Sequence, residues 1–221
     1  MARVTHAKPE GASPNPTKKY IGWKSNDKTF SYYDKQLKDN VEVKLPLKFV
    51  FLQHYHTVKG WNDASSSGIY ANEVFYIGNE EMSVRAFKGG LLASGLYKDI
   101  KPKVEAAGGK YHRSIYITLE DGTLANLSIK GAVVKEWSDF YEKSKNLIDN
   151  QWVEIKEARA EKKGSINYSV PVFSLGESLD KKAIQLADVA ASELSDHMEN
   201  YFADKDDAIV NVEAVSNDLS F

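Results

Sequence analysis

The stretch VEVKLPLKFVFL, residues 41–52, decides the fold class of this chain. Its apolar side chains recur at every second position, and the charged residues Glu42, Lys44 and Lys48 stand between them. A period of two is typical of a β-strand with one buried face, so a strand is predicted over 41–52. Pro46 has no N–H to give to a neighbouring strand, so a bulge or a sheet edge is expected near it.

Outward from this stretch, period-two segments and turn residues predict more strands, and apolar residues spaced by three or four predict helices. The expected strands are 20–24, 29–34, 69–77, 82–87, 110–120, 123–129, 152–158 and 165–173, and residues 54–68 are expected to form a loop. The expected helices are 97–107, 132–145 and 178–202. Gly89 and Gly90 are expected to break the sheet.

From residue 41 onward, the order of strands and helices is that of the OB-fold, a small Greek-key barrel. The predicted fold class is therefore mainly β with helices, an OB-fold-like β-barrel followed by a C-terminal helix. The expected parts are a disordered leader over 1–17, a body with an N-terminal hairpin over 18–176, a helix over 177–202 and a flexible acidic tail over 203–221. The leader is expected to be disordered because three prolines stand among small polar residues without periodicity.

The charge is divided unevenly along the chain, although the formal net charge is only −2. Residues 177–221 hold 3 Lys and 11 Asp or Glu, whereas residues 1–176 carry a net charge of +6. Parts of opposite sign suggest a basic body for a polyanion and an acidic end for another partner. The alternative is that the acidic end only keeps the protein soluble.

The composition also bears on location and chemistry. The chain has no cysteine, which excludes disulfides, thiolate zinc sites and cysteine nucleophiles. It has no apolar run of about 20 residues and no signal-peptide core, so a soluble protein of the cytoplasm is expected.

Catalytic patterns are missing from the sequence. Phosphate-binding loops of the Walker type, dinucleotide fingerprints and nucleophile elbows are absent, so a protein that is not an enzyme and needs no cofactor is expected. His54 and His56 alternate along a strand and could share a metal, but no third ligand stands near them, so no metal site is predicted. A metal-dependent nuclease acting through these histidines and scattered acids is the alternative.

Lysines and aromatic residues are interleaved between residues 18 and 61. This stretch holds nine Lys against four acids and nine aromatic residues, of which Phe49 and Phe51 are assigned to the core. Bases stack on aromatic rings while lysines follow the phosphates, so the mixture indicates binding of single-stranded nucleic acid. The predicted contacts here are Trp23, Lys24, Lys28, Tyr32, Tyr33, Lys35, Lys48, Tyr55, Lys59 and Trp61.

A second basic and aromatic patch lies at 110–116. It adds Lys110, Tyr111, Arg113 and Tyr116, and Arg85 and Lys88 of a neighbouring strand are expected to line the same groove. Because side chains alternate between the faces of a strand, these residues cannot all meet one ligand.

The acidic tail ends in an aromatic residue. Asp204, Asp206, Asp207, Glu213 and Asp218 stand against the single Lys205, and Phe221 is the last residue. A terminal Phe can place its ring in an apolar pocket and its carboxylate on a basic rim, which is a known mode of peptide capture. These residues are therefore predicted to bind a partner protein.

The aromatic basic body over 20–173 and the acidic end over 204–221 together resemble bacteriophage-type single-stranded DNA-binding proteins of the OB-fold class. The resemblance implies sequence-independent binding and protection of single strands in replication, recombination or repair, in a host cytoplasm. It also implies that the tail recruits replication proteins and competes with DNA for the basic groove. No residue pattern separates DNA from RNA, and the long helix is expected either to pack on the barrel or to form a homodimer. The alternative is a protein-interaction or virion-associated protein without a nucleic-acid role.

Overall fold

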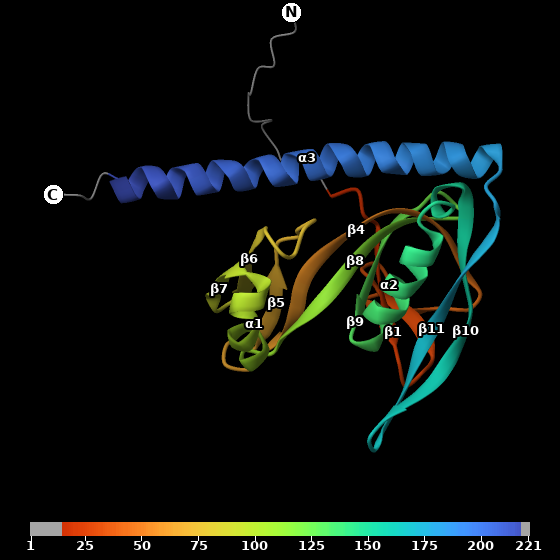
Figure 1. Cartoon of the computed structure of the whole chain (residues 1–221), viewed down its shortest axis with the longest axis horizontal. Helices are drawn as coiled ribbons and strands as arrows, with labels where there is room; N and C mark the ends of the chain where they lie inside the picture. The colour runs from red at the N-terminus through yellow and green to blue at the C-terminus, as the bar shows by residue number, and fades with distance from the viewer. Residues whose placement is uncertain (1–14, 218–221) are drawn as a thin grey trace, which may run out of the picture.

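A computed structural model describes residues 15–217 of the chain, with the side chains of residues 15–201. This part of the protein is mainly β, an 11-stranded sheet with helices on its faces (Figure 1). The strands are β1 (Lys19–Lys24), β2 (Thr29–Asp34), β3 (Asp39–Val43), β4 (Leu47–Asn62), β5 (Ser67–Ala71), β6 (Glu81–Ala86), β7 (Gly90–Leu96), β8 (Gly109–Leu119), β9 (Leu124–Lys130), β10 (Gln151–Lys163) and β11 (Ile166–Ser178). The helices are α1 (Tyr97–Ala106), α2 (Ala132–Ser144), the short 3-10 helix η1 (Ile148–Asn150) and α3 (Lys181–Asn217).

The sheet is open. Its strand order is β3-β2-β1-β9-β8-β4-β5-β6-β7, and the end strands β3 and β7 do not pair with each other, so the predicted closed barrel is wrong. The reason lies in β4, whose two ends have different neighbours: its first residues pair with β10 and its last residues pair with β5. The sheet therefore branches at β4, and its edge strands β3 and β7 do not meet to close a barrel.

The decisive stretch 41–52 holds two strands rather than one. β3 ends at Val43 and β4 begins at Leu47, with Pro46 in the break between them. β4 then runs through most of the predicted loop to Asn62, because β8 pairs with it from Phe49 to Gly60 and receives its backbone hydrogen bonds.

Further elements differ from their prediction, among them the strand expected over 69–77, which ends at Ala71. The two glycines expected to break the sheet at 89–90 instead lead into β7, which pairs with β6. Helix α3 continues to Asn217 rather than ending at residue 202, so residues 203–217 of the predicted tail have a helical backbone. Of the predicted leader, residues 1–14 lie outside the described residues, while Thr17 is buried and its N–H donates to the side chain of Asn15.

Helices α1 and α2 cover one face of the sheet, here called the packed face. Trp137 of α2 is fully buried there among Phe49, Phe51 and other residues of β4 and β8. Val104 of α1 lies in a separate apolar cluster with Val58 of β4. The two helices stand over different ends of the sheet, with β4 and β8 running between them (Figure 1).

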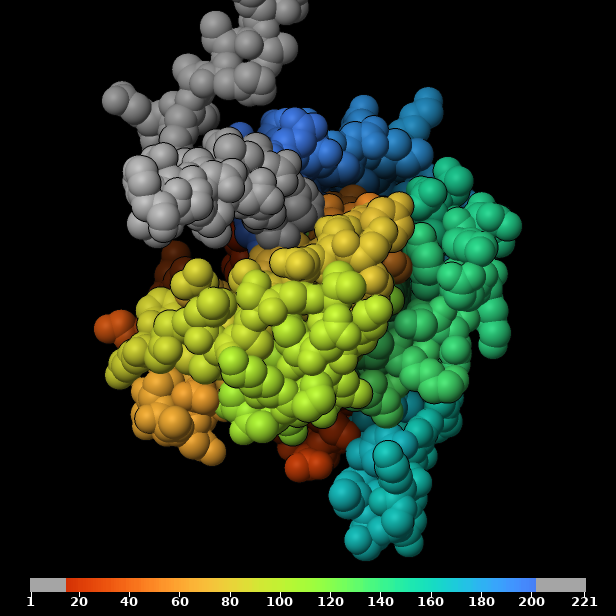
Figure 2. All heavy atoms as spheres, turned by 60° about the vertical axis from the view of Figure 1, so that its left-hand side comes forward, coloured from red at the N-terminus to blue at the C-terminus, as the bar shows by residue number. Residues whose placement is uncertain are grey.

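The opposite face of the sheet is called here the open face. Helix α3 crosses it and packs Leu194 and Met198 against Tyr55, Tyr116 and Leu124. Strands β10 and β11 extend from the body as a two-stranded arm. In Figure 2 the lobe of β5 to β7 with α1 faces the viewer, and the arm projects below it on the right. The strands next to α3 carry the exposed side chains described below.

Strands β4 and β8 come very close together at their ends, next to Lys59 and Lys110. A β-carbon placed on Gly60 would lie 2.3 Å from the carbonyl oxygen of Gly108, whereas one on Gly68 would meet nothing within 4 Å. We therefore expect Gly60→Ala to lower the free energy of unfolding by about 2 kcal/mol, because the backbone must move apart. Urea unfolding with Gly68→Ala as the matched control tests this, and equal midpoints for the two variants would contradict it.

Candidate nucleic-acid interface

Four side chains form a row across four neighbouring strands of the open face. Arg85 of β6 lies opposite Tyr70 of β5, Tyr70 lies opposite Lys59 of β4, and Lys59 lies opposite Lys110 of β8. Residues directly opposite each other in antiparallel strands point to the same face of a sheet. These four residues are called here the cross-strand row.

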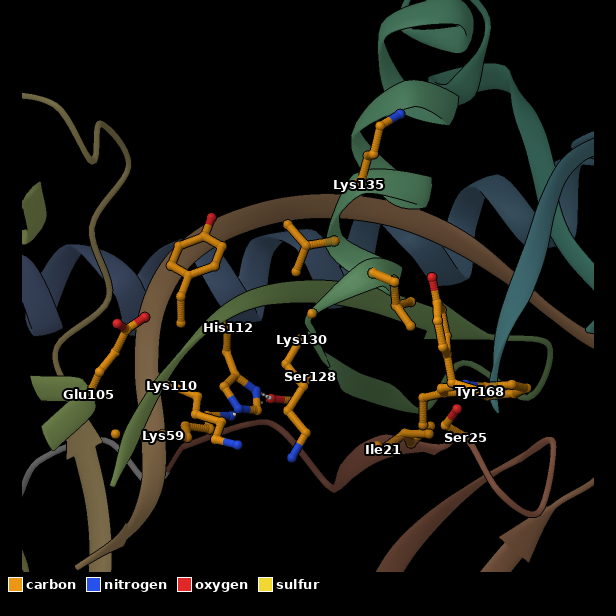
Figure 3. A pocket seen from close by; sticks show the side chains of 18 of the residues that line it. Ile21, Ser25, Lys59, Glu105, Lys110, His112, Ser128, Lys130, Lys135 and Tyr168 are labelled. Atoms are coloured by element: carbon orange, nitrogen blue, oxygen red, sulfur yellow. Dashed lines mark hydrogen bonds between the residues drawn. The ribbon is translucent and has the colours of Figure 1, made fainter. Parts of the chain in front are cut away.

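Basic residues continue beyond the row onto β9 and β1. His112 of β8 lies opposite Lys130 of β9. The ammonium group of Lys59 donates to the hydroxyl of Ser128 at 3.0 Å and lies 5.8 Å from the ring centre of Tyr20. The row therefore joins a basic area at the ends of β8 and β9 (Figure 3).

This basic area opens into a groove between α1 and α2 with a volume of 1130 Å³. Its walls are formed by Glu105 of α1 on one side and Lys135 of α2 on the other (Figure 3). Five lysines line it, namely Lys59, Lys101, Lys110, Lys130 and Lys135, and Glu105 is the carboxylate among its lining residues. The excess of positive charge will concentrate anions in the groove.

The lysines at the centre of this area, Lys59, Lys110 and Lys130, lack an ion-pair partner among the side chains of residues 15–201. Glu105 pairs instead with Lys101 one helical turn away, at 3.8 Å. Desolvation lowers the pKa of Lys59, and the nearby carboxylate of Glu73 opposes this effect.

Exposed aromatic rings lie in the cross-strand row, beside it, and on β1 and β2. The exposed fractions are 57% for Trp61, 47% for Tyr70, 81% for Phe87, 49% for Tyr20 and 57% for Tyr33. Phe87 and Tyr70 are in contact, with ring centres 6.0 Å apart. Rings of this size are rarely left in water in such a group unless they serve a ligand.

The packed face carries a polar cluster in the gap between α1 and α2. Arg113 contacts Nε2 of His56 at 3.2 Å, and Nδ1 of His56 is 2.6 Å from the hydroxyl of Tyr111. Arginine can only donate, so Nε2 of His56 accepts and its Nδ1 carries the proton that is donated to Tyr111. Desolvation and the charge of Arg113 lower the pKa of His56 to about 4, which agrees with a neutral ring.

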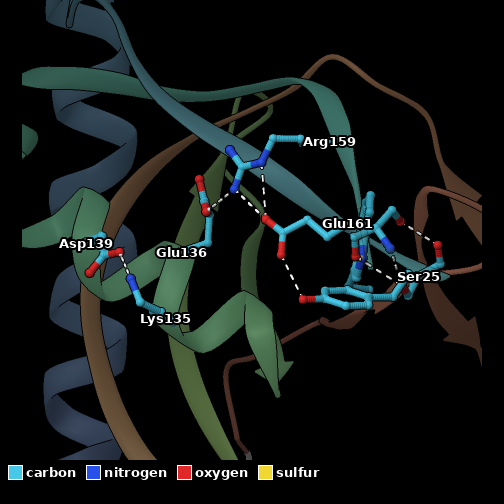
Figure 4. A network of polar contacts seen from close by, with 9 residues as sticks. Ser25, Lys135, Glu136, Asp139, Arg159 and Glu161 are labelled. Atoms are coloured by element: carbon cyan, nitrogen blue, oxygen red, sulfur yellow. Dashed lines mark hydrogen bonds and ion pairs between the residues drawn. The ribbon is translucent and has the colours of Figure 1, made fainter. Parts of the chain in front are cut away.

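A network of ion pairs and hydrogen bonds holds the α2 side of the groove (Figure 4). Arg159 of the arm contacts Glu136 of α2 at 2.9 Å and Glu161 at 2.7 Å, and Tyr168 donates to Glu161 at 2.8 Å. Tyr168 lines the groove, so these contacts orient its ring. Exposed ion pairs contribute little stability, and the network chiefly fixes the position of the arm against α2.

Metal ligation finds little support in the described residues. Within them, no group of three or more His, Asp or Glu side chains is arranged to hold a metal ion. His54 accepts a hydrogen bond at Nδ1 from Trp137 at 3.1 Å, and both ring nitrogens of His56 are already engaged.

The structure brings together part of the predicted site and separates the rest. On the open face or its rim lie Lys59, Trp61, Arg85, Lys88, Lys110 and Tyr33. On the packed face, Trp23 and Tyr111 line the groove, Arg113 contacts His56, and Tyr32 packs against the core beside α2. As expected from alternation, residues 110–116 divide between the two faces.

Other predicted residues lie away from the groove. Tyr55 and Tyr116 are 8% and 4% exposed, because α3 covers them, so as placed they are core residues and not surface contacts. Lys48 lies over the ring of Trp152 at 4.7 Å, at the other end of β4. Lys24 ends β1, and Lys28 and Lys35 occupy exposed turns of the N-terminal hairpin.

The sequence prediction missed several residues of the open face. They are Tyr20, Tyr70, Phe87, His112 and Lys130. Tyr70 could have been found from its alternation with Ile69 in β5, but the parallel pairing of β1 with β9 that brings Tyr20 opposite Asn126 has no sequence signal.

The tail residues are described only in part. The backbones of Asp204, Asp206, Asp207 and Glu213 belong to α3. Asp218 and Phe221 lie outside the described residues.

Comparison with protein families, with curated proteins and with solved structures gave no match to this chain. Within the described residues, no helix combines the length and the apolar character needed to cross a membrane.

The histidines of this region are expected to stay neutral in mildly acidic solution. Desolvation is the largest cause that lowers the pKa of His54 and His56 to about 4 and that of His112 to about 3. As the pH falls below 6.5, these histidines bind protons in the unfolded chain but stay neutral in the folded chain. The free energy of unfolding should therefore be highest above pH 6.5 and fall between pH 6.5 and 4, by about 1 kcal/mol per histidine and pH unit.

Imidazole NMR signals recorded between pH 7.5 and 5, with urea unfolding at the same pH values, test this expectation. The three rings should keep neutral chemical shifts throughout. Half-titration of any of them near pH 6.5 would contradict the described burial.

Proposed function

We propose that this protein binds single-stranded nucleic acid, DNA in the first place, without sequence preference, and protects it during replication, recombination or repair. The observation that carries the proposal is the cross-strand row of Arg85, Tyr70, Lys59 and Lys110, flanked by exposed aromatic rings. The lysines and the arginine supply phosphate contacts, and the rings supply platforms for unstacked bases.

The arrangement favours a single strand over a duplex. In a duplex the faces of the bases are stacked on one another, so the rings of Trp61, Tyr70 and Phe87 would have no base face to contact. The described elements also include no helix-turn-helix whose recognition helix could enter a major groove. Stacking tolerates every base, so sequence-independent binding is expected.

Trp61 offers a direct optical test. It is 57% exposed beside the cross-strand row, whereas Trp137 is fully buried. We expect oligo(dT) to quench the tryptophan fluorescence of the wild type, and we expect Trp61→Phe to bind while losing part of this quenching, since Trp23 also lines the groove. Trp61→Ala should bind about 5- to 150-fold more weakly, because one stacking contact contributes about 1–3 kcal/mol.

If the wild type shows no quenching and no retention on single-stranded DNA cellulose in about 50 mM salt, the proposed function is wrong, since phosphate contacts are strongest at low salt. Quenching that persists unchanged in Trp61→Phe would place the strand elsewhere on the protein.

The charges of the row offer a second test. We expect the double variant Lys59→Gln, Lys110→Gln to lower the slope of log affinity against log salt by about 1.4, because each phosphate contact with a single strand contributes about 0.7. Lys103→Gln is the matched control, since Lys103 is exposed on α1 and does not line the groove. Equal slopes for the double variant and the control would contradict the assignment of these lysines.

We propose that the acidic C-terminal segment competes with the strand for the same basic surface and recruits replication or recombination proteins. Its support is charge, since residues 177–221 carry a net charge of −8 while the rest of the chain carries +6. Deletion of residues 204–221 should tighten oligo(dT) binding several-fold at low salt. A full-length variant with Asp204, Asp206, Asp207, Glu213 and Asp218 made neutral should do the same; unchanged affinity in both would remove the competition and leave the binding proposal standing.

A further inference from the structure

The polar cluster of Tyr111, His56 and Arg113 has donors but lacks an anion. The Nε atom of Arg113 is buried without a hydrogen-bond partner, and among ion pairs between residues 15–201 none involves its guanidinium group. An arginine stays charged in a protein, and a partly buried charge without a counter-ion is costly.

The hydroxyl of Tyr111 is also left as a donor. It receives the Nδ1 proton of His56, because Nε2 of the same ring accepts from Arg113. Among the hydrogen bonds of residues 15–201, none gives the hydroxyl's own proton to an acceptor, and Arg113 also donates to the hydroxyl oxygen. Arg113 thus offers N–H groups and Tyr111 offers an O–H group. The neutral ring of His56 lies between them and holds both side chains in place.

Within residues 15–201, no carboxylate forms an ion pair with Arg113. The charge that acts on His56 is that of Arg113, and the charge on Tyr111 is again that of Arg113. The acid of the neighbouring wall, Glu105, acts on Tyr97 and pairs with Lys101. An unmatched guanidinium beside a free hydroxyl donor is the chemistry that recognises a phosphate.

The cluster borders the groove through Tyr111, whereas His56 and Arg113 are not among the residues that line it. Tyr111 lines this groove together with Lys59, Lys110 and Lys130, although Tyr111 points to the packed face and Lys110 to the open face. β9 ends at Lys130 opposite His112, so the first residues of β8 have no neighbouring strand on that side. A bound nucleic-acid strand would pass from one face to the other at this end of β8, beside Gly131, which leads from β9 into α2.

We propose that Tyr111, His56 and Arg113 form a phosphate subsite on the packed face, which holds a backbone phosphate of a single strand that leaves the cross-strand row and enters the groove. This inference rests on the proposed function. His56 is a positioning residue in it, and Arg113 and Tyr111 make the contacts. The bound nucleic-acid strand would then contact both faces of the sheet rather than one.

The test uses the full-length protein and oligo(dT) over a range of salt concentrations. Arg113→Gln should lower the slope of log affinity against log salt by about 0.7, the contribution of one phosphate, and Tyr111→Phe should weaken binding several-fold with the slope unchanged. Arg113→Lys keeps the charge and should keep the slope of the wild type. Lys103→Gln should match the wild type, and thermal unfolding of each variant confirms that it is folded.

A second experiment with inorganic phosphate distinguishes a subsite for a nucleic-acid phosphate from a subsite for a free anion. Phosphate should shift the imidazole NMR signals of His56 in the wild type but not in Arg113→Gln, and oligo(dT) should prevent this shift. A shift that oligo(dT) does not prevent overturns the strand assignment.

The two proposals fail in different ways. If Arg113→Gln binds oligo(dT) with the affinity and slope of the wild type while the Lys59, Lys110 double variant is impaired, the subsite is wrong and the proposed function stands. If the wild type does not bind oligo(dT) at all, both proposals are wrong.

Discussion

The rest of the structure depends on the pairing of β4 with β8. The register from Phe49 opposite Leu119 to Gly60 opposite Gly109 spans both ends of the sheet, with a bulge after Phe51. At one end it turns apolar side chains of both strands toward Trp137. At the other end it places Lys59 beside Lys110 on the open face and Val58 beside Tyr111 on the packed face. One register thus sets both the core and the two polar surfaces.

Both surfaces carry positive charge that no ion pair of residues 15–201 neutralises. Lys59 donates a hydrogen bond to the hydroxyl of Ser128 and lies near the ring of Tyr20. Arg113 donates a hydrogen bond to the neutral ring of His56. By contrast, Arg159 of the arm forms ion pairs with two carboxylates. A protein that needs cations for structure pairs them, as at Arg159; unpaired cations beside exposed rings are better explained by an anionic ligand that also has flat faces.

Local patterns in the sequence predicted much of the fold. Strands β1, β2 and β6 and helices α1 and α2 lie within a residue or two of their expected bounds, because apolar periodicity and turn residues act locally. Three predictions were wrong, namely the closed barrel, the loop over 54–68 and the break at 89–90. They depend on which distant strand supplies the backbone hydrogen bonds, since β4 continues to Asn62 where it pairs with β8, and β7 forms where it pairs with β6.

The candidate site was predictable to a similar degree. Composition pointed to Lys59, Trp61 and Lys110, and alternation correctly divided residues 110–116 between two faces. Composition could not show that α3 covers Tyr55 and Tyr116, or that β1 pairs in parallel with β9 and adds Tyr20. These outcomes depend on contacts between residues far apart in the chain, which periodicity in one segment does not encode.

The central claim is that a single strand lies along the cross-strand row, and lysine footprinting by mass spectrometry tests it most directly. Bound oligo(dT) should protect Lys59, Lys110 and Lys130 from acetylation and leave Lys98 and Lys103, exposed on α1, as reactive as in the free protein. Equal reactivity of all five lysines with and without oligo(dT), or protection of Lys24, Lys28 and Lys35 in their place, would contradict the account.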